Sequence, residues 1–590
     1  MPQAIDTLPA VLDDAARRFG ARLAYAEGAR RVTWSQLAGR VDDVAAGLVA
    51  LGLQPGDRAA ICAENSIDWI TAYHAIARAG SIAVLVYYEL QRREIEDQVR
   101  RPQCRLLFAS PDVLEKLPGG IDGVEHVIAL GAPSSSEADG SQTLDALAAR
   151  ATAESRTALD SRAPQPDTTA AIVYTSGTTG GAKGAMLSQR NLLSNAGAAI
   201  EALELGEDDS SLLVLPMHHA MPLIAAIVLP PLIGAHFAIE NDLRRIRDRL
   251  QEFRPTIFFG VPALYELVYR NILARAEAEG RLKTLQRVQR VTGLIKRLTG
   301  VNLAPLAFKS VNRALGGRLK FLVSGGAALN PQTVHDFSGL GLLLLQGWGM
   351  TEASPVIAVQ RYSRRRFLYS NYYERHAGSV GPVLPGVEVR LVDVPDKGIT
   401  VAEAGEGEVL VRGPNVFQGY WQAEDATREV LQDGWLRTGD LARIDAEGNI
   451  TLTGRSKYVI VLESGEKVHP DELEAVLAQS DLLQDLCVLG RELSNGRTTR
   501  THVTAVVYPS VEVAQKRSGA LDAAALHKLV DAEIDALCKQ LAAYKRVTRI
   551  VLTDTPLPKT ALRKVARGSL RESYDFDYEA WVASVEELDQ

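Results

Sequence analysis

A short run of glycines and hydroxyl residues constrains this chain more than any other segment: Tyr174-Thr-Ser-Gly-Thr-Thr-Gly-Gly-Ala-Lys-Gly184. It overlaps the apolar stretch Ala170–Tyr174, which predicts a strand. Glycine lets backbone N–H groups approach a ligand closely, and hydroxyls with one ammonium match the oxygens of a polyphosphate. The segment therefore predicts a strand that leads into a phosphate-binding loop.

Two other interpretations of this loop fit its residues less well. A Walker loop needs Ser or Thr directly after its lysine to hold magnesium, and here Gly184 follows Lys183. A flexible linker rich in Gly and Thr would not require the strand pattern that precedes it. A phosphate-binding loop of another type is favoured.

The loop resembles the glycine-rich motif of the adenylate-forming superfamily, which includes acyl-CoA synthetases, luciferases and the adenylation domains of peptide synthetases. Other segments resemble motifs of that family and occur in the family's order: Leu215-Pro-Met-His-His219, Phe259-Gly-Val-Pro-Ala-Leu-Tyr265, Gln346-Gly-Trp-Gly-Met-Thr-Glu352, Gly434-Trp-Leu-Arg-Thr-Gly-Asp440, Gly454-Arg-Ser-Lys457 and Pro558-Lys-Thr-Ala-Leu-Arg-Lys564. Together they extend over most of the chain.

This resemblance implies an α/β fold with two domains. We expect a large N-terminal AMP- and acyl-binding domain over residues 1–454, built of helix-covered parallel sheets and a distorted barrel. A hinge over 455–458 and a small, mobile α+β lid domain over 459–590 would follow. The helix and turn that end near residue 57, followed by the buried strand Arg58–Cys62, show the alternation typical of parallel sheets. We expect residues 131–166 to form a loose connection on the surface.

Composition agrees with a soluble, multidomain enzyme. The chain has 590 residues, 46% of them hydrophobic and 23% charged, and its net charge of −7 does not favour a nucleic-acid partner. The cysteines lack paired spacing, which argues against disulfides or a zinc site: Cys62, Cys104, Cys487 and Cys538. With no secretory signal pattern at the start, we expect a cytoplasmic protein.

Ser210 to Ile239 contains no charged Asp, Glu, Lys or Arg and is long enough to span a bilayer. Prolines interrupt it at positions 216, 222, 230 and 231, and three histidines lie inside it. A membrane helix is therefore disfavoured. We expect a buried strand, helix and strand around an apolar cavity.

The resemblance also implies the chemistry. A carboxylate would attack the α-phosphate of ATP and release pyrophosphate, and the thiol of coenzyme A would then displace AMP. No protein nucleophile is required, so positioning and charge stabilisation should dominate. The family's nucleotide-binding roles map onto these residues: Thr175, Ser176, Gly177, Thr178, Thr179 and Lys183 for the β- and γ-phosphates; Gly325, Gly326, Ala327, Gln346, Gly347 and Trp348 for the adenine groove; Asp440 and Arg455 for the ribose side.

Two further roles concern the reacting phosphate. Thr351 would bond the α-phosphate, and Glu352 would bind Mg²⁺, which prefers carboxylate oxygen. Lys564 would bridge the attacking carboxylate and the α-phosphate. Arg563 stands where the family commonly has glycine before this lysine, which leaves Lys559 as a second candidate for the working amine.

The resemblance assigns weaker roles near the hinge. Lys457 matches the hinge residue, whose backbone would absorb a rotation of the lid domain. Gly465 and Glu466 lie in the loop expected near the pantetheine of coenzyme A.

The acid substrate is expected to be apolar. Amino-acid adenylation domains place an Asp just after the element equivalent to Leu215–His219, and here Ala220-Met-Pro-Leu follows. His219 matches the histidine that gates or orients the acid, and His218 takes the adjacent aromatic position. A metal site on this pair is disfavoured because no third ligand is nearby. Residues 454–474 are most similar to long-chain fatty acid–CoA ligases.

Two alternatives for the function stay open. The acyl group could pass to an acyl carrier protein in place of free coenzyme A, because both present the same thiol. The chain could also be an inactive lipid-binding scaffold, although the joint presence of the motif residues argues against it.

Residues 281–320 contain ten Lys or Arg and no Asp or Glu, interleaved with apolar residues. Among them, Arg287, Arg290, Lys296 and Arg297 follow a helical spacing. Such a helix can lie on an anionic membrane surface, which would make the enzyme peripheral there. A solvated helix face is the other interpretation of the same pattern.

Overall fold

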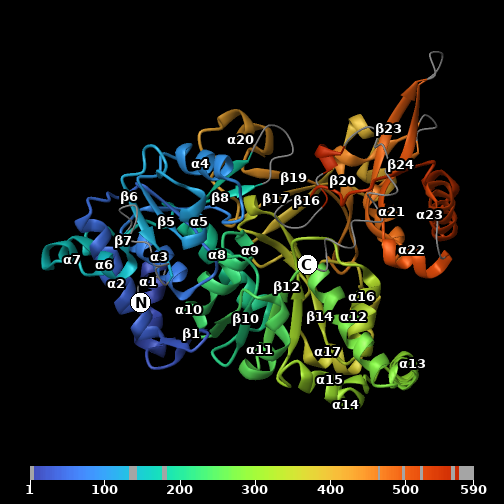
Figure 1. Ribbon diagram of the computed structural model, residues 1–590, viewed down its shortest axis with the longest axis horizontal. Helices are drawn as coiled ribbons and strands as arrows, with labels where there is room; N and C mark the ends of the chain where they lie inside the picture. Colours follow the sequence, from blue (N-terminus) through green and yellow to red (C-terminus); the bar gives the residue numbers. More distant parts are fainter. Residues whose placement is uncertain are drawn as a thin grey trace. The chain divides into compact units, whose positions relative to one another are not determined.

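The computed structural model describes residues 6–131, 142–175, 182–462, 466–494, 499–518, 522–559, 565 and 567–570. It contains two compact units (Figure 1). Unit 1 comprises Met1–Val389, Val411–Leu436 and Glu447–Ile450; unit 2 comprises Arg390–Leu410, Arg437–Ala446 and Thr451–Gln590. The expected domain limits at 454 and 459 stay a prediction.

Unit 1 is built on two large sheets of mainly parallel strands. The eight-stranded sheet has the order β15-β14-β13-β12-β10-β11-β1-β2, and the seven-stranded sheet has the order β7-β6-β5-β3-β4-β8-β9. Their strands are β1 (Leu23–Glu27), β2 (Arg30–Thr33), β3 (Arg58–Cys62), β4 (Ile82–Leu85), β5 (Leu106–Ala109), β6 (His126–Ala129), β7 (Gln142–Thr143), β8 (Thr169–Thr175), β9 (Lys183–Ser188), β10 (Ser210–Leu213), β11 (His236–Ile239), β12 (Ile257–Gly260), β13 (Phe321–Ser324), β14 (Leu344–Gly349) and β15 (Val356–Val359). The predicted α/β class is confirmed.

Helices flank these strands because their apolar faces need cover. Examples are α2 (Trp34–Ala50) and α3 (Ile67–Arg78), which contact each other and bury their aromatic and aliphatic residues. The Thr33 side chain begins α2 in a capping box with Gln36. The predicted strands at Ala170–Tyr174 and Arg58–Cys62 are confirmed as β8 and β3.

Unit 2 has its own core. Its three-stranded sheet has the order β23-β24-β25, over Leu483–Ser494, Thr499–Pro509 and Arg549–Leu552. Helices α21 (Pro470–Leu477) and α23 (Ala523–Cys538) bury Leu473, Leu477 and Val530 in the same cluster as Val488. Pro470 is the first residue of α21, a position where proline is favoured.

The expectation of a loose connection over 131–166 is wrong for its described part. It contains β7, α6 (Leu144–Ala148) and α7 (Ala153–Asp160). The Thr143 and Thr152 hydroxyls accept hydrogen bonds from the first turns of these helices, and Leu147 and Leu159 are buried. The sequence did not indicate these short helices because the Ser and Thr residues that cap helices are also typical of turns.

The apolar segment Ser210–Ile239 folds as predicted into strand, helix and strand. It forms β10, α9 (Ala220–Leu223), the π-helical turn η1 (Ile224–Val228), α10 (Leu229–Ile233) and β11. Pro222 lies in the first turn of α9, and Pro230 and Pro231 lie in the first turn of α10, where a missing N–H is tolerated. Over the described residues, no helix is both long and apolar enough to cross a membrane.

Strand β14 leads into the short helix η3 (Thr351–Ala353) through a position that only glycine fits. A Cβ atom on Gly349 would lie 1.8 Å from the carbonyl oxygen of Pro355, which is a backbone atom and cannot move aside. A Cβ on Gly347, in the same strand, would meet the Val359 side chain at 3.5 Å and the Ala358 carbonyl oxygen at 3.6 Å, which are ordinary van der Waals distances.

We expect Gly349→Ala to destabilise unit 1 by about 1–3 kcal/mol, the usual cost of overpacking a filled site. The matched Gly347→Ala variant should lose less than half of that. Chemical unfolding of both variants measures the difference. Equal stability of the two variants would contradict the tight turn described here.

Candidate active site

A buried carboxylate lies at the centre of the predicted nucleotide site in unit 1. Glu352 is 7% exposed, and its Oε1 atom accepts a hydrogen bond of 2.7 Å from the Tyr420 hydroxyl. Burial, and then the neighbouring carboxylate, raises the pKa of Tyr420 well above its usual value. The phenol therefore keeps its proton and remains a donor to Glu352.

The segment 414–421 joins this carboxylate to strand β9. The backbone N–H of Phe417 donates to the Glu352 carbonyl at 2.9 Å. Further along, the Met186 N–H donates to the Gly419 carbonyl at 2.9 Å, and the Trp421 N–H donates to Gly184 at 2.8 Å. The segment is thereby fixed on β9 and on η3 at the same time.

Lys183 opens strand β9, and its ammonium lies 5.3 Å from the centroid of the Tyr420 ring. Thr175 ends β8 directly opposite, and its hydroxyl donates to the Lys183 carbonyl at 3.4 Å. Tyr420 thus contacts both Lys183 of the predicted phosphate-binding loop and Glu352 of the predicted magnesium motif. Four predicted phosphate-binding residues lie outside the described residues: Ser176, Gly177, Thr178 and Thr179.

The predicted adenine groove lies at the carboxyl ends of two adjacent parallel strands. Ser324 of β13 is in register with Gln346 of β14, so the segment Gly325, Gly326 and Ala327 lies beside the segment Gln346, Gly347 and Trp348. The Ser324 hydroxyl and the Gln346 Oε1 atom are buried and have no hydrogen-bond partner among the described residues. Unpaired buried polar atoms at such strand ends fit a nucleotide with donors and acceptors of its own.

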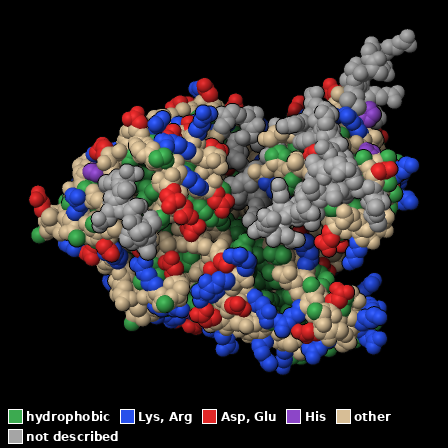
Figure 2. Space-filling model, in the orientation of Figure 1, with side chains coloured by type: hydrophobic (Ala, Val, Ile, Leu, Met, Phe, Trp, Pro, Cys, Tyr) green, Lys and Arg blue, Asp and Glu red, His purple; other side chains and the backbone are tan. Residues whose placement is uncertain are grey.

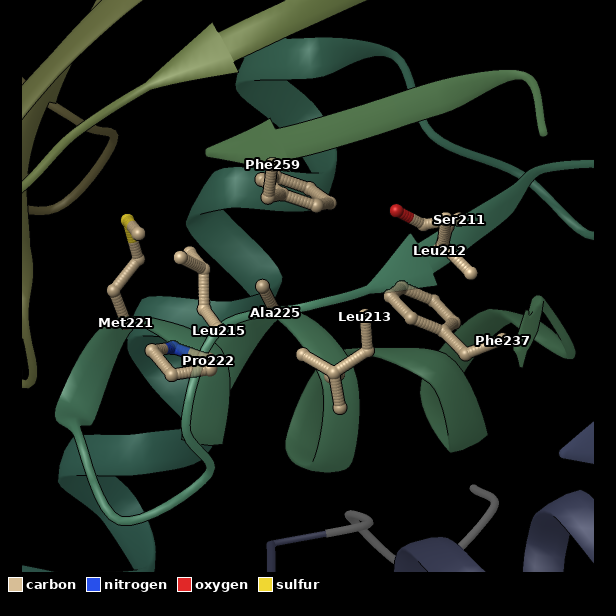
Figure 3. Close-up of a pocket in the computed structure, with 10 residues that line it drawn as sticks. Ser211, Leu212, Leu213, Leu215, Met221, Pro222, Ala225, Phe237 and Phe259 are labelled. Carbon is tan, nitrogen blue, oxygen red and sulfur yellow. The ribbon is translucent and has the colours of Figure 1, made fainter. Parts of the chain in front are cut away.

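A small apolar cavity of about 10 Å³ adjoins this groove, large enough for about one water molecule. Figure 3 shows Met221, Leu215, Phe259 and Phe237 among the side chains around it. A Cβ on Gly325 would come within 2.8 Å of the Met221 sulfur, so the cavity side chains reach the groove. The expected apolar cavity in this segment is confirmed.

The two histidines lie at the start of α9 in an aromatic stack. The His218 and His219 ring centroids are 3.9 Å apart, and Tyr87 stacks on His218 at 4.4 Å. Burial lowers the pKa of His219 to about 4, and burial, then the neighbouring His219, lowers the pKa of His218 well below its usual value, so both are neutral at pH 7. Asn65 holds the preceding turn through bonds to Met217 and Leu215.

In unit 2, Asp440 and Arg455 form an ion pair of 3.0 Å, and the aspartate is buried. The Asp440 N–H donates to the Thr438 hydroxyl at 3.1 Å, which fixes the turn. Burial, and then the charge of Arg455, lowers the pKa of Lys457. The predicted ribose and hinge residues are therefore close together in this unit.

The structure provides few contacts that bear on the predicted roles of the remaining residues of unit 2. Glu466 is exposed, and its carbonyl accepts a bond from the Leu462 N–H at 2.9 Å. Lys559, the second candidate for the working amine, is engaged in an ion pair of 2.7 Å with Asp485. Gly465 and Lys564 lie outside the described residues.

Comparison of the sequence with models of protein families identifies the family of this chain. The model described as AMP-binding enzyme matches residues 12–421, and that of the AMP-binding enzyme C-terminal domain matches residues 457–585. The chain belongs to the AMP-binding enzyme family. Family membership makes it an adenylate-forming enzyme, as the motifs predicted.

Known members of the family resemble it over most of its length. A protein named long-chain-fatty-acid–CoA ligase FadD15 from Mycobacterium bovis is 29% identical over 480 residues, 78% of this chain and 75% of its own. The indoleacetate–CoA ligase of Aromatoleum aromaticum is 29% identical and covers 92% of this chain and 93% of its own. The crystal structure of ATP-bound MatB from Rhodopseudomonas palustris aligns with a TM-score of 0.71 at 28% identity, covering 95% of this chain and 98% of that one.

Sequence reasoning on this AMP-binding enzyme missed Tyr420, Tyr87 and Asn65. Each acts on a motif residue from a distant part of the chain, and none belongs to a motif that the sequence analysis used. The aromatic pair Tyr420-Trp421 after Gly419 is the sequence feature that could have indicated a buried segment here. The assignment of Glu352 to Mg²⁺ stays a prediction, and the described residues hold no group of three His, Cys, Asp or Glu side chains that could bind a metal ion.

We expect Tyr420→Phe to raise the Mg²⁺ concentration needed for half-maximal adenylation by about tenfold, since a hydrogen bond to a charged group contributes about 1.5–3 kcal/mol. The ring that faces Lys183 is retained in this variant. A magnesium titration of pyrophosphate release measures the shift. Tyr420→Leu should lose the ring contact as well and weaken ATP binding further.

A lower melting temperature with an unchanged magnesium titration would mean that Tyr420 only stabilises the fold. Tyr373→Phe, which removes the hydrogen bond of another buried tyrosine of unit 1 to the Arg361 carbonyl at 2.9 Å, serves as the matched control. It should leave the magnesium titration unchanged.

Proposed function

We propose that this chain activates a long-chain fatty acid with ATP and transfers the acyl group to coenzyme A, releasing AMP and pyrophosphate. Family membership supports the first half-reaction. The names of the relatives support the coenzyme A acceptor. The name of FadD15 supports a long acyl chain, whereas indoleacetate is an aromatic acid.

The observation that best supports this proposal is the set of residues that line the apolar cavity next to the predicted adenine groove. Nine of its ten lining residues are apolar, and the remaining one is Ser211. No acidic side chain is present to pair with a substrate amine, so an amino acid would bury an unpaired charge there. An apolar acid gains free energy in the same place.

A long chain needs more room than the cavity now offers. Met221 and Leu215 border it, and the unbranched Met side chain changes conformation at small cost. The five-residue π-helical turn η1 forms one wall, and such turns often occur at functional sites. We propose that an acyl chain enters by displacing these side chains.

We propose that the residues of unit 1 act mainly by positioning charge. The Lys183 ammonium would pair with the β- and γ-phosphates, and the Thr351 hydroxyl would donate to the α-phosphate. Glu352 would hold Mg²⁺ jointly with phosphate oxygens, and the ion when bound would neutralise phosphate charge. His219, which is neutral at pH 7, would orient the carboxylate without adding a charge.

Two roles in unit 2 complete the proposal. Asp440, an acceptor held by Arg455, would bind the ribose hydroxyls. Lys564 would stabilise the attack of the carboxylate on phosphorus, and Lys457 would serve as the hinge residue.

The test measures pyrophosphate and AMP release with acids from acetate to oleate, indoleacetate and phenylalanine, each with and without coenzyme A. We expect turnover with oleate that requires coenzyme A, and none with phenylalanine. Preference for indoleacetate would overturn the long-chain assignment. Release of pyrophosphate without turnover by coenzyme A would favour a carrier protein as acceptor.

Variants of the cavity wall should shift the chain-length optimum in opposite directions. Ala225→Leu fills the cavity and should move the optimum toward shorter acids by about tenfold in relative kcat/KM, whereas Phe259→Ala should favour longer ones. Phe258→Leu is the matched control, because Phe258 lies in the same strand and packs against Tyr265 in the core. It should lower stability without changing the optimum. An optimum that does not move in either cavity variant would show that the chain binds elsewhere.

A further inference from the structure

Helix α13 (Leu282–Thr299) has a clearly defined inner face in unit 1. Leu285 and Val288 pack against the core, and Thr292 and Lys296 are buried. The Lys296 ammonium bonds to the Ser338 hydroxyl at 3.2 Å and forms an ion pair with Glu374. Lys296, which the sequence groups with the other cations of this helix, therefore faces inward.

The outer face of α13 combines arginines with exposed aliphatic side chains. Its members recur every three or four residues: Arg287, Arg290, Val291, Leu294, Arg297 and Leu298. Val291 is 52% exposed, Leu294 57% and Leu298 75%. A helix face adapted only to water would carry polar residues at these aliphatic positions. We call these six residues the α13 face.

Exposed apolar residues continue past the end of the helix. Gly300 ends α13 beside the backbone of Tyr369, and the Asn302 N–H donates to the Leu368 carbonyl at 2.8 Å. Tyr369 is 64% exposed, and Leu306 on the adjoining α14 (Ala304–Ala307) is 63% exposed. Bulky apolar side chains thus gather around the C-terminal end of α13.

The charge of this region is opposite to that of the whole protein. Residues 281–320 hold ten Lys or Arg and no acid, whereas the chain as a whole has a net charge of −7. Figure 2 shows Lys and Arg side chains gathered at the edge of the molecule where α13 lies. A local positive field of this kind attracts an extended anionic surface.

We infer that the α13 face docks on the surface of a membrane that contains anionic phospholipids. Arginines would contact the headgroups, and Leu294, Leu298 and the Tyr369 ring would enter the boundary with the acyl chains, as in helices that lie in the interfacial plane. Exposed arginines next to exposed leucines on one helix face match the boundary between lipid headgroups and acyl chains, which favours a bilayer over a protein partner. The inference goes beyond the proposed function: it names the surface from which a poorly soluble acid would be collected.

The experiment is co-sedimentation of the full chain with vesicles of phosphatidylglycerol and phosphatidylcholine, compared with phosphatidylcholine alone. We expect binding to the anionic vesicles only, weakened by salt. The variant Arg287→Glu with Arg290→Glu and Arg297→Glu should bind about tenfold or more weakly, because each basic residue near an anionic surface adds to affinity. Absence of binding by the unmodified chain would overturn the inference, and an acidic protein would then become the better partner.

The matched control reverses three exposed cations of unit 2, Lys528→Glu with Lys539→Glu and Arg546→Glu. It makes the same change in net charge and should keep vesicle binding. Equal loss in both triple variants would show that net charge, and not this face, governs binding.

The variant Leu294→Ser with Leu298→Ser tests the apolar part without changing charge. It should weaken vesicle binding several-fold at high salt while its melting temperature and its turnover of a soluble acid stay unchanged. Unchanged binding would overturn the insertion of these leucines. Because turnover of a soluble acid does not need vesicles, failure of the proposed function and failure of this inference are distinguishable.

Discussion

The buried carboxylate of Glu352 is the constraint on which the candidate active site depends. A charged group that is removed from water is tolerated only when hydrogen-bond donors or an opposite charge compensate it. The Tyr420 hydroxyl supplies one such donor at 2.7 Å, and in the proposed reaction the carboxylate would also bind Mg²⁺. The structure of the surrounding segments follows from the need to hold that tyrosine in place.

That need explains why the segment 414–421 is bonded on two sides. Its bonds to β9 fix it next to Lys183, and its bond from Phe417 fixes it to the turn that carries Glu352. The ammonium of Lys183 and the carboxylate of Glu352 have opposite charges and would otherwise attract each other directly. Tyr420 lies against both, which keeps the two charges available for ATP and Mg²⁺ in the proposed reaction.

Much of this site could be predicted from residue types at fixed spacing. Lys183 and Glu352 stand in short motifs whose chemistry is local, and the strands around them have a strong apolar pattern. Tyr420 could not be found in this way, because its bond to Glu352 joins residues 68 positions apart. The inward position of Lys296 could not be predicted for a similar reason. Helix α13 has aliphatic residues on two faces, and the sequence does not indicate which face packs against the core. The core contacts and the ion pair with Glu374 show it.

The central claim is that a carboxylic acid attacks the α-phosphorus of ATP. The most direct measurement uses oleate labelled with ¹⁸O in its carboxylate, and follows the label by mass spectrometry of the products. Formation and cleavage of the acyl-adenylate moves one carboxylate oxygen into AMP, so labelled AMP is the predicted result, together with unlabelled pyrophosphate. Label in inorganic phosphate, with ADP as the other product, would mean an acyl phosphate intermediate and would contradict the account.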